Sequence, residues 1–153
     1  MINPMDLTGK RILVTGATGG MGVEASIQLS KLGANVVICG RNGEKLQKVF
    51  EMLEGKGHAK HVLDLNDVDS IEENIKKMVT EHGMFHGFAF CAGIAPMRPL
   101  KMTKRENMIE VMNANLFSFI EIVRCITKKG YFADEGSIVA ISSTASIQGK
   151  QSK

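Results

Sequence analysis

The sequence has no apolar run that approaches the roughly 18 residues a membrane-spanning helix needs. Met1 to Lys10 also lacks a basic segment followed by an apolar one, so no secretory signal is expected. The 19 basic and 16 acidic residues leave a net charge of +3 without a basic block or interleaved aromatic residues, so neither nucleic acid nor a membrane is indicated as a partner. These absences favour a cytoplasmic protein.

Cysteine and histidine are sparse, and neither is spaced as a metal site requires. Cys39, Cys91 and Cys125 are odd in number, far apart and set among apolar residues, which favours buried thiols in a reducing compartment over disulfides. The four histidines include no HExxH motif and no cysteine–histidine pairing at ligand spacing. We interpret them as structural and expect no metal site.

The most informative stretch that is present is Val14 to Gly22, which reads VTGATGGMG. It overlaps Arg11 to Thr15, a short β-branched run typical of a buried parallel strand. The apolar pattern from Val23 to Leu32 then indicates a helix, which Gly33 would close. The glycines therefore lie on a strand-to-helix turn.

This context gives the glycines a chemical interpretation. Gly16 permits a sharp exit from the strand, while Gly20 and Gly22 lack the β-carbons that would keep a pyrophosphate from the N–H groups at the helix start. The alternative is that the glycines serve only the turn. A P-loop is not expected, because no Gly-Lys-Ser/Thr follows.

Strand and helix patterns alternate along the whole chain. The chain has the length of one domain, 44% of its residues are hydrophobic, and it shows no repeat or linker, so we expect a single domain over residues 1–153. Further strands are expected at Asn35–Gly40, Ala59–Leu63, Gly87–Cys91 and Ser137–Ile141. Helices are expected at Gly43–Leu53, from N-caps Asn66 or Asp69 to about Gly83, and at Thr103–Lys129. This order predicts an α/β fold, a Rossmann-like doubly wound parallel sheet that stops after its fifth strand.

Thr15, Gly16, Gly20 and Gly22 form the pattern TGxxxGxG, which resembles the short-chain dehydrogenase/reductase family. The resemblance covers the N-terminal part of a family member. It implies a nicotinamide cofactor and hydride transfer to or from a small-molecule carbonyl or secondary alcohol, of which a 3-oxoacyl thioester is the commonest substrate in the family.

The residues just past each strand are the expected ligand contacts, because ligands bind at the carboxyl ends of such sheets. At Arg41 an arginine would pair with the 2′-phosphate of NADP(H), and the neutral Gly40 stands where a carboxylate would select NAD(H). NADPH is therefore favoured over NADH; the alternative is that Arg41 merely begins a helix in solvent. The resemblance implies that Asp64 contacts the adenine amino group with Leu65 alongside, and helix capping is the alternative for Asp64.

After the fourth strand, Cys91-Ala92-Gly93 stands where the family shows Asn-Asn-Ala-Gly or Asn-Ala-Gly. Ala92 and Gly93 match, and their small size lets the backbone approach a ribose. Cys91 departs from the pattern, and its apolar neighbours disfavour a thiolate. The full set of expected cofactor contacts is Gly16, Thr18, Gly19, Gly20, Met21, Gly22, Arg41, Asn42, Asp64, Leu65, Cys91, Ala92 and Gly93.

Two further residues are candidates for catalysis. Asn115 lies on an apolar stripe that we expect to be buried, formed by Met108, Met112, Phe119, Ile122 and Ile126, whereas Asn113 falls on another face. The resemblance implies that Asn115 opens the helix and holds a water in a proton relay; the alternative is a bond to nearby backbone. It also implies that Ser143 steadies the substrate oxygen, although paired serines after a strand usually form a turn.

In that family a tyrosine downstream of the serine protonates the carbonyl oxygen, and a lysine lowers the pKa of that tyrosine. Both would fall past Lys153, and the only tyrosine, Tyr131, precedes the fifth expected strand. The chain is therefore either a piece of a longer enzyme or a natural short form, and we prefer the first because the edge of Ser137–Ile141 would otherwise be unpaired.

We expect the chain alone to be inactive as a reductase. The full-length enzyme is expected to form homo-oligomers through the long helix. The competing function is a catalytically silent dinucleotide-binding module or sensor.

Overall fold

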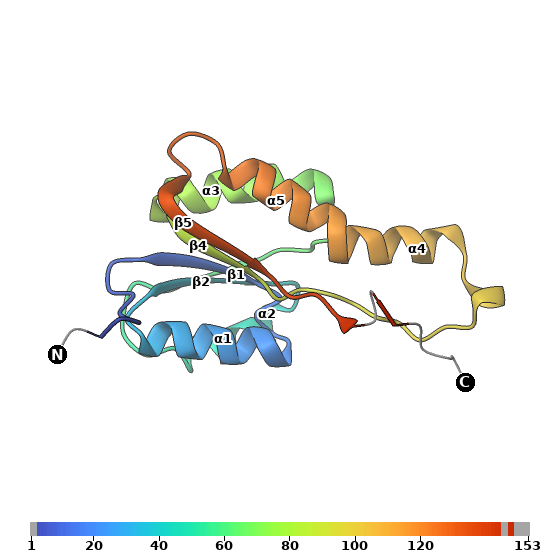
Figure 1. Ribbon diagram of the computed structural model, residues 1–153, viewed down its shortest axis with the longest axis horizontal. Coiled ribbons are helices and arrows are strands. Elements are labelled where there is room, and N and C mark those ends of the chain that lie inside the picture. The colour runs from blue at the N-terminus through green and yellow to red at the C-terminus, as the bar shows by residue number, and fades with distance from the viewer. Residues whose placement is uncertain (1–2, 145–146, 149–153) are drawn as a thin grey trace.

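A parallel sheet in the order β3-β2-β1-β4-β5 forms the centre of the protein, which is described here by a computed structural model covering residues 3–144 and 147–148 (Figure 1). The strands are β1 (Arg11–Thr15), β2 (Asn35–Gly40), β3 (Ala59–Val62), β4 (Phe85–Phe90) and β5 (Phe132–Ala140). Strand order reverses between β1 and β4, because the chain passes from the β3 edge back across β1. This reversal creates the crevice in which doubly wound sheets bind ligands.

Helices cover both faces of the sheet, as right-handed crossovers require. The helices are α1 (Gly20–Lys31), α2 (Gly43–Phe50), α3 (Ile71–His82), α4 (Arg105–Met112) and α5 (Ser118–Ile126). Figure 1 shows α1 and α2 on one face, α3 and α5 on the other, and α4 extending past the sheet. Short 3₁₀ turns at Val68–Ser70 and Leu100–Met102 precede α3 and α4. No helix of the described part of the chain is both long and apolar enough to cross a membrane.

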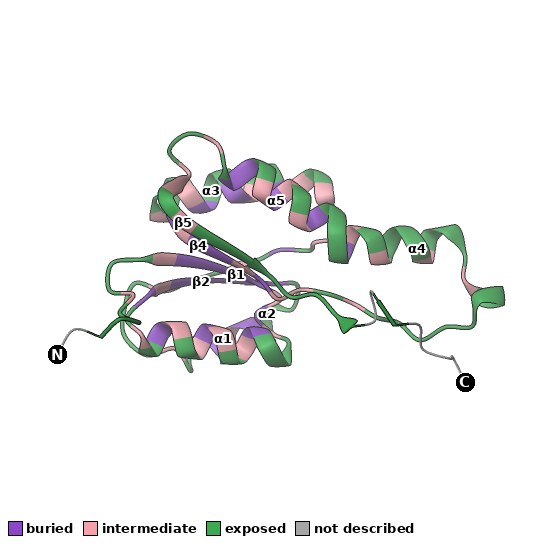
Figure 2. Cartoon of the chain, in the orientation of Figure 1, coloured by how far each residue is buried: buried purple, intermediate pink, exposed green. Residues whose placement is uncertain are grey.

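The core has two layers because neighbouring residues of a strand face opposite sides of the sheet. Leu13 lies with Phe88 and Ile122 in the layer under α3 and α5. Ile12 and Val14, the neighbours of Leu13, pack with Leu46 in the layer under α1 and α2. Figure 2 shows this burial concentrated in the strands and on the inner faces of the helices. The predicted Rossmann-like α/β class is confirmed.

Several predicted boundaries were wrong by a few residues. α1 begins at Gly20 rather than Val23, α2 ends at Phe50 rather than Leu53, and β5 begins at Phe132 rather than Ser137. β5 is also exposed rather than buried, with Val139 57% exposed, since it forms an edge of the described sheet. The expected N-caps Asn66 and Asp69 do not cap α3; Ser70 precedes that helix and makes no side-chain capping bond.

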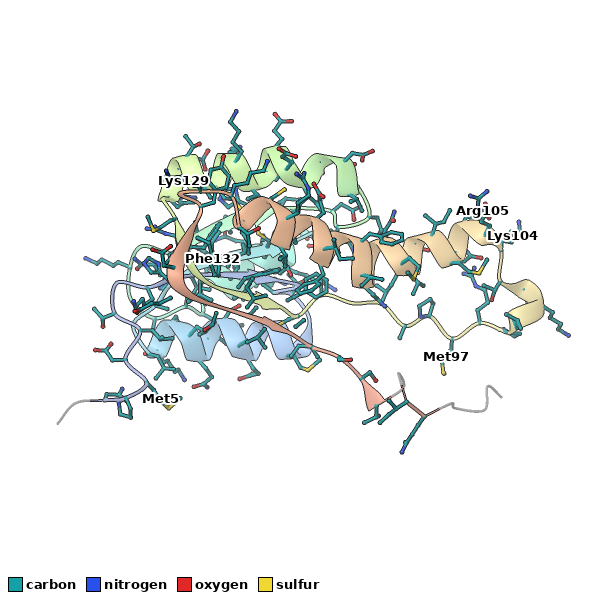
Figure 3. All side chains as sticks on the ribbon, turned by 45° about the horizontal axis from the view of Figure 1, so that its top comes forward. Met5, Met97, Lys104, Arg105, Lys129 and Phe132 are labelled. Carbon is teal, nitrogen blue, oxygen red and sulfur yellow. The ribbon has the colours of Figure 1, made fainter. Side chains whose placement is uncertain are left out.

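The predicted helix Thr103–Lys129 is divided in the structure. A π-helical turn at Asn113–Phe117 separates α4 from α5. Only the α5 half of the expected apolar stripe is buried, because α4 has no sheet beneath it: Ile122 and Ile126 are fully covered, whereas Met108 is 51% exposed. Figure 3 shows Lys104 and Arg105 at the end of α4 far from Phe132, where β5 begins.

Candidate functional site

A cavity of about 250 Å³ opens at the carboxyl ends of β1, β2, β3 and β4. It lies where the strand order reverses, at the crevice that the fold predicts. Its lining consists of Thr15, Gly16, Thr18, Gly19, Cys39, Gly40, Arg41, Leu63, Asp64, Leu65, Asn66, Cys91, Ala92, Gly93, Ile94 and Ala114. Four separate strand ends therefore contribute to one site.

The glycine loop after β1 forms one wall of the cavity. Gly16 has φ +67°, and a β-carbon there would lie 2.5 Å from the backbone of Ala92, so no other residue fits between the two loops. A β-carbon on Gly22 would lie 2.2 Å from the carbonyl oxygen of Gly16. Gly22 is buried and lets α1 pack closely against the loop, and its predicted contact with a pyrophosphate stays a prediction. Gly20 has open space around its β-carbon position.

The N-terminus of α1 faces this site with its backbone N–H groups uncapped. The N-cap residue Gly19 has extended backbone (φ −90°, ψ 161°), and it has no side chain to accept from the first turn. The first turn also contains no acidic residue. Uncapped N–H groups and the positive end of the helix dipole together favour an anion at this position.

Two polar atoms in the cavity wall are buried without a partner. Within the described residues, neither the Thr15 hydroxyl oxygen nor the Asn66 side-chain oxygen has a hydrogen-bond partner. A buried polar atom of this kind costs free energy unless something satisfies it. A ligand with hydrogen-bond donors would satisfy both.

Arg41 and Asp64 lie at the rim of the cavity, both exposed to solvent. Arg41 forms no ion pair with any described residue, so its guanidinium is available to a ligand. One carboxylate oxygen of Asp64 accepts the N–H of Asn66 at 3.0 Å, which shapes the turn after β3.

Four residues expected to contact the cofactor lie outside the cavity lining: Gly20, Met21, Gly22 and Asn42. Asn42 caps α2, since its side-chain oxygen accepts the N–H of Lys45 at 2.9 Å. Met21 points to solvent from the first turn of α1 and is 60% exposed. Asn42 directly follows the cavity residue Arg41, and Met21 comes two residues after Gly19, but the side chains of Asn42 and Met21 are turned away from the cavity.

The two cavity thiols are protonated. Burial raises the pKa of the Cys91 thiol, and it raises the pKa of Cys39 to about 12. Cys39 also lies 3.9 Å from the sulfur of Met78. The expectation of buried thiols holds for Cys39 and Cys125, whereas Cys91 is only half-buried.

Asn115 lies in the π-helical turn and holds the loop after β4. Its side-chain oxygen accepts the N–H of Ile94 at 2.8 Å, and its amide nitrogen donates to the carbonyl of Ile94 at 2.9 Å. Contrary to the expectation of burial, Asn115 is exposed, and its amide bonds to backbone as the alternative interpretation had it. A role in a proton relay stays a prediction.

Asn113, which the helical pattern set aside, also contributes to the architecture of the site. Its amide nitrogen donates to the carbonyl of Asn66 at 3.0 Å and so links the π-helical turn to the loop after β3. The π-helical turn therefore fixes two cavity loops at once. A helical wheel cannot show this, because the extra residue of a π turn shifts the phase of the helix.

Ser143 lies past β5 at the same end of the sheet. The N–H of Ile141 donates to the carbonyl of Phe90 at 3.0 Å, which extends the β4–β5 pairing up to the loop that holds Cys91. Ser143 and Asn115 both lie outside the cavity lining itself. The lining residues that sequence analysis missed are Thr15, Cys39, Leu63, Asn66, Ile94 and Ala114. Thr15, Cys39 and Leu63 lie at or next to the last residue of a strand, which is the signal that could have identified them.

Comparison with known proteins gives a consistent assignment. Residues 10–153 match the short chain dehydrogenase family. The chain is 32% identical over 146 residues to L-xylulose reductase of Caenorhabditis elegans, covering 94% of this chain and 57% of that protein. It is 32% identical over 148 residues to the 3-oxoacyl-acyl-carrier-protein reductase FabG of Thermotoga maritima, covering 95% of this chain and 60% of that protein.

A solved structure shows the same fold. It is that of a Shigella flexneri 2a protein, described as a short-chain dehydrogenase and complexed with NADP, and it matches with a TM-score of 0.84 at 28% identity, covering 97% of this chain and 65% of that one. The chain thus spans less than two thirds of the length of these relatives. By sequence and by fold it belongs to the short-chain dehydrogenase family.

Proposed function

We propose that residues 1–153 form a single dinucleotide-binding domain and that its cavity binds NADPH for a carbonyl or alcohol oxidoreductase. The observation that carries this proposal is the convergence of four strand ends on one cavity that contains an uncapped helix N-terminus and two unpartnered buried polar atoms. A dinucleotide offers what each feature lacks: phosphate oxygens for the N–H groups of α1, and hydroxyl or amino donors for Thr15 and Asn66. The residues present therefore fit the cofactor.

Each wall of the cavity has a distinct task in this proposal. The loop from Gly16 to Gly20 and the N-terminus of α1 hold the pyrophosphate. Asp64 and Leu65 hold the adenine, and the small residues Ala92 and Gly93 let the backbone approach a ribose. When bound, the nicotinamide supplies or accepts hydride; the protein's own contribution is to bind and orient it.

The preference for NADPH over NADH rests on Arg41. Its guanidinium lies at the rim beside the neutral Gly40 and has no acidic partner among the described residues, so a 2′-phosphate is a suitable anion for it. The NADP complex of the Shigella flexneri relative is consistent with this choice.

For the chemical step we propose that Ser143 donates a hydrogen bond to the substrate oxygen and that Asn115 positions a water for proton transfer. Asn115 holds Ile94 in the loop after β4, and Ser143 follows β5 at the cavity end of the sheet. The two curated relatives reduce different carbonyl compounds by name, a 3-oxoacyl thioester and L-xylulose, so we propose a small-molecule carbonyl as substrate, with a 3-oxoacyl thioester first.

We also propose that the full-length enzyme is a homo-oligomer, since apolar residues of α4 and α5 such as Ile109 and Ile120 are exposed.

The decisive test of the cofactor proposal is fluorescence titration with NADPH and NADH. Arg41→Ala is expected to weaken NADPH binding about ten- to a hundredfold, because a charge-assisted phosphate contact is lost, and to leave NADH binding unchanged. Lys45→Ala is the matched control: it removes an exposed cation in the first turn of α2, outside the cavity lining. Equal affinities for the two cofactors in the wild type would contradict the assignment, and absence of any binding would contradict the function.

A further inference from the structure

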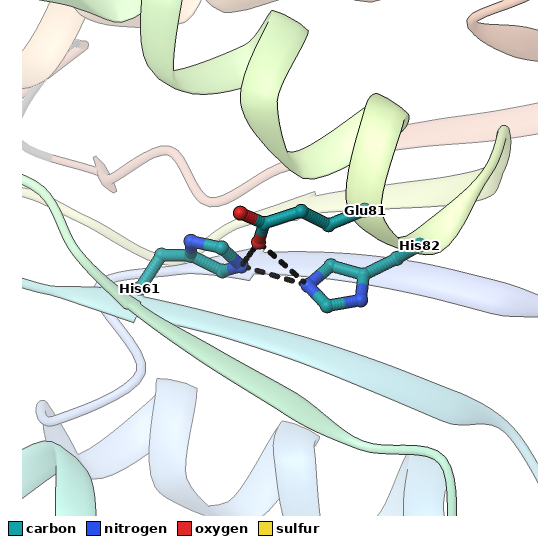
Figure 4. A group of neighbouring side chains, drawn as sticks. All are labelled: His61, Glu81 and His82. Atoms are coloured by element: carbon teal, nitrogen blue, oxygen red, sulfur yellow. Dashed lines mark hydrogen bonds and ion pairs between the residues drawn. The ribbon is translucent and has the colours of Figure 1, made fainter.

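A second cluster of functional side chains lies away from the nucleotide cavity, between β3 and the end of α3. His61 projects from β3, and Glu81 and His82 are the last two residues of α3. Figure 4 shows the three side chains converging on one point. The Nε2 atoms of the two histidines lie 2.9 Å apart, and a Glu81 carboxylate oxygen lies 3.6 Å from His82 Nε2 and 3.9 Å from His61 Nε2.

Without an ion, the two imidazoles form a hydrogen bond through their Nε2 atoms, and Glu81 lies at ion-pair distance from both, so a bound metal ion would take the place of that hydrogen bond. In a tetrahedral zinc site, bonds of about 2.0–2.2 Å place neighbouring ligand atoms about 3.3–3.5 Å apart. The three separations here lie on either side of that value, so small side-chain rotations would bring all three ligand atoms into the coordination sphere. The two imidazole rings lie edge to face, with an angle of 71° between their planes.

We propose that His61, His82 and Glu81 bind one divalent transition-metal ion, with Zn²⁺ as the best-suited ion and water as its fourth ligand. Imidazole and carboxylate ligands suit zinc, whereas Mg²⁺ and Ca²⁺ prefer oxygen alone. The side chains of His61, His82 and Glu81 are 11%, 27% and 43% exposed, so the ligands are held by their elements while one side of the site is open to solvent.

The electrostatic surroundings are mixed, with more features that favour a cation than oppose one. The carboxylate of Glu81 and the negative end of the α3 dipole attract a cation. Lys77, one turn earlier on α3, opposes it. Burial, followed by the nearby charges of His82 and Lys77, lowers the pKa of His61, whereas the carboxylate of Glu81 acts in the opposite direction.

The ion would have a structural rather than catalytic role. None of the three ligands lines the nucleotide cavity, and the site bridges the edge strand β3 to the helix that follows it. Metal binding would therefore clamp a short, four-residue edge strand to the body of the domain. The inference is independent of the proposed cofactor.

The test uses the full-length protein without a histidine tag, with Zn²⁺ added in a buffer free of chelators. Calorimetry should show one strong zinc site per chain, and saturating zinc should raise the unfolding midpoint by about 2–8 °C. Mg²⁺ should produce neither effect. No zinc binding at millimolar concentration would overturn the proposal.

Single substitutions then locate the site. His61→Gln, His82→Gln and Glu81→Gln should each lower zinc affinity at least tenfold and leave NADPH affinity unchanged. The matched control is His86→Gln on β4, where His86 Nδ1 accepts the N–H of Arg11 at 3.1 Å, and its zinc affinity should equal that of the wild type. Because Glu81 is exposed, Glu81→Gln folds even if a histidine variant does not, and wild-type zinc affinity in Glu81→Gln would overturn the proposal. A thiolate charge-transfer band on binding of Co²⁺ would show that a cysteine binds the ion, and it would also overturn the proposal.

Discussion

At the scale of single residues, a substitution of Thr15 gives the sharpest distinction between a structural role and a ligand-binding role. Its hydroxyl is fully buried in the cavity wall and has no hydrogen-bond partner among the described residues. Thr15→Val removes the unpartnered oxygen, so we expect the ligand-free protein to gain about 1 kcal/mol in free energy of unfolding and NADPH binding to weaken about tenfold. Urea unfolding and fluorescence titration measure the two effects.

Ser26→Ala is the control for this prediction. The Ser26 hydroxyl is equally buried but donates to the carbonyl of Gly22 at 2.7 Å, so its loss should cost stability, about 1 kcal/mol, without changing NADPH affinity. If Thr15→Val instead destabilised the protein and left NADPH binding intact, the hydroxyl would have a structural partner and no contact with the cofactor.

Sequence alone identified the residues whose role follows from their position after a strand. Gly16, Arg41, Asp64 and Ala92 were predicted as cavity residues and do line it. Thr15 and Asn66 were missed because an unpartnered atom is a property of packing, which no spacing pattern records. The packing role of Gly22 was missed for the same reason, because its contact with Gly16 depends on how closely α1 lies against the loop.

At the scale of elements, a charge network joins α3 to α5. Glu72 on α3 accepts from both Arg124 and Lys128, and these hydrogen bonds and charges lower its pKa from 4.5 to about 2. Arg124 also bonds to Glu121 on its own helix at 2.8 Å. Because the pKa of Glu72 is lower in the folded state, its contribution to stability is present above pH 4.5 and is lost as the pH falls toward 2.

We therefore expect Glu72→Gln to unfold at a lower midpoint than the wild type at neutral pH, with the difference shrinking as the pH falls through that range. Added salt should also shrink it, because the groups are exposed and screened. Thermal unfolding across pH is the measurement, and Glu44→Gln on α2 is the control, since Glu44 forms no ion pair among the described residues. A difference that stays constant with pH would mean that the network does not contribute through charge.

The boundaries of strands and helices were predictable where burial of apolar residues determines them. β1 and β2 were predicted to the residue because their apolar runs are enclosed on both faces. β5 begins five residues earlier than its apolar run, since Phe132 pairs with Phe85 across a register shift that only the neighbouring strand determines. The π-helical turn at Asn113–Phe117 could not be predicted from the apolar periodicity, because that pattern assumes a constant number of residues per turn along the helix.

At the scale of the whole molecule, cofactor binding and turnover should be separable. The cavity, the glycine loop and the rim residues all lie within residues 1–153, which span 57–60% of the two curated relatives. The only tyrosine, Tyr131, lies directly before β5, and its carbonyl accepts the N–H of Phe85 at the amino end of β4. That end is opposite to the cavity, so Tyr131 cannot protonate a substrate bound beside the nicotinamide.

We therefore expect residues 1–153 expressed alone to bind NADPH without oxidising it when an acetoacetyl thioester or a sugar ketone is added. A longer form, carrying a tyrosine and a lysine downstream of Ser143, should bind NADPH with similar affinity and consume it in the presence of a carbonyl substrate. Within that form, Ser143→Ala should reduce kcat about a hundredfold or more, because one donor to the developing oxyanion is lost, whereas Tyr131→Phe should leave kcat unchanged. Turnover by residues 1–153 that disappears in Tyr131→Phe would assign the acid to Tyr131 and contradict the arrangement proposed here.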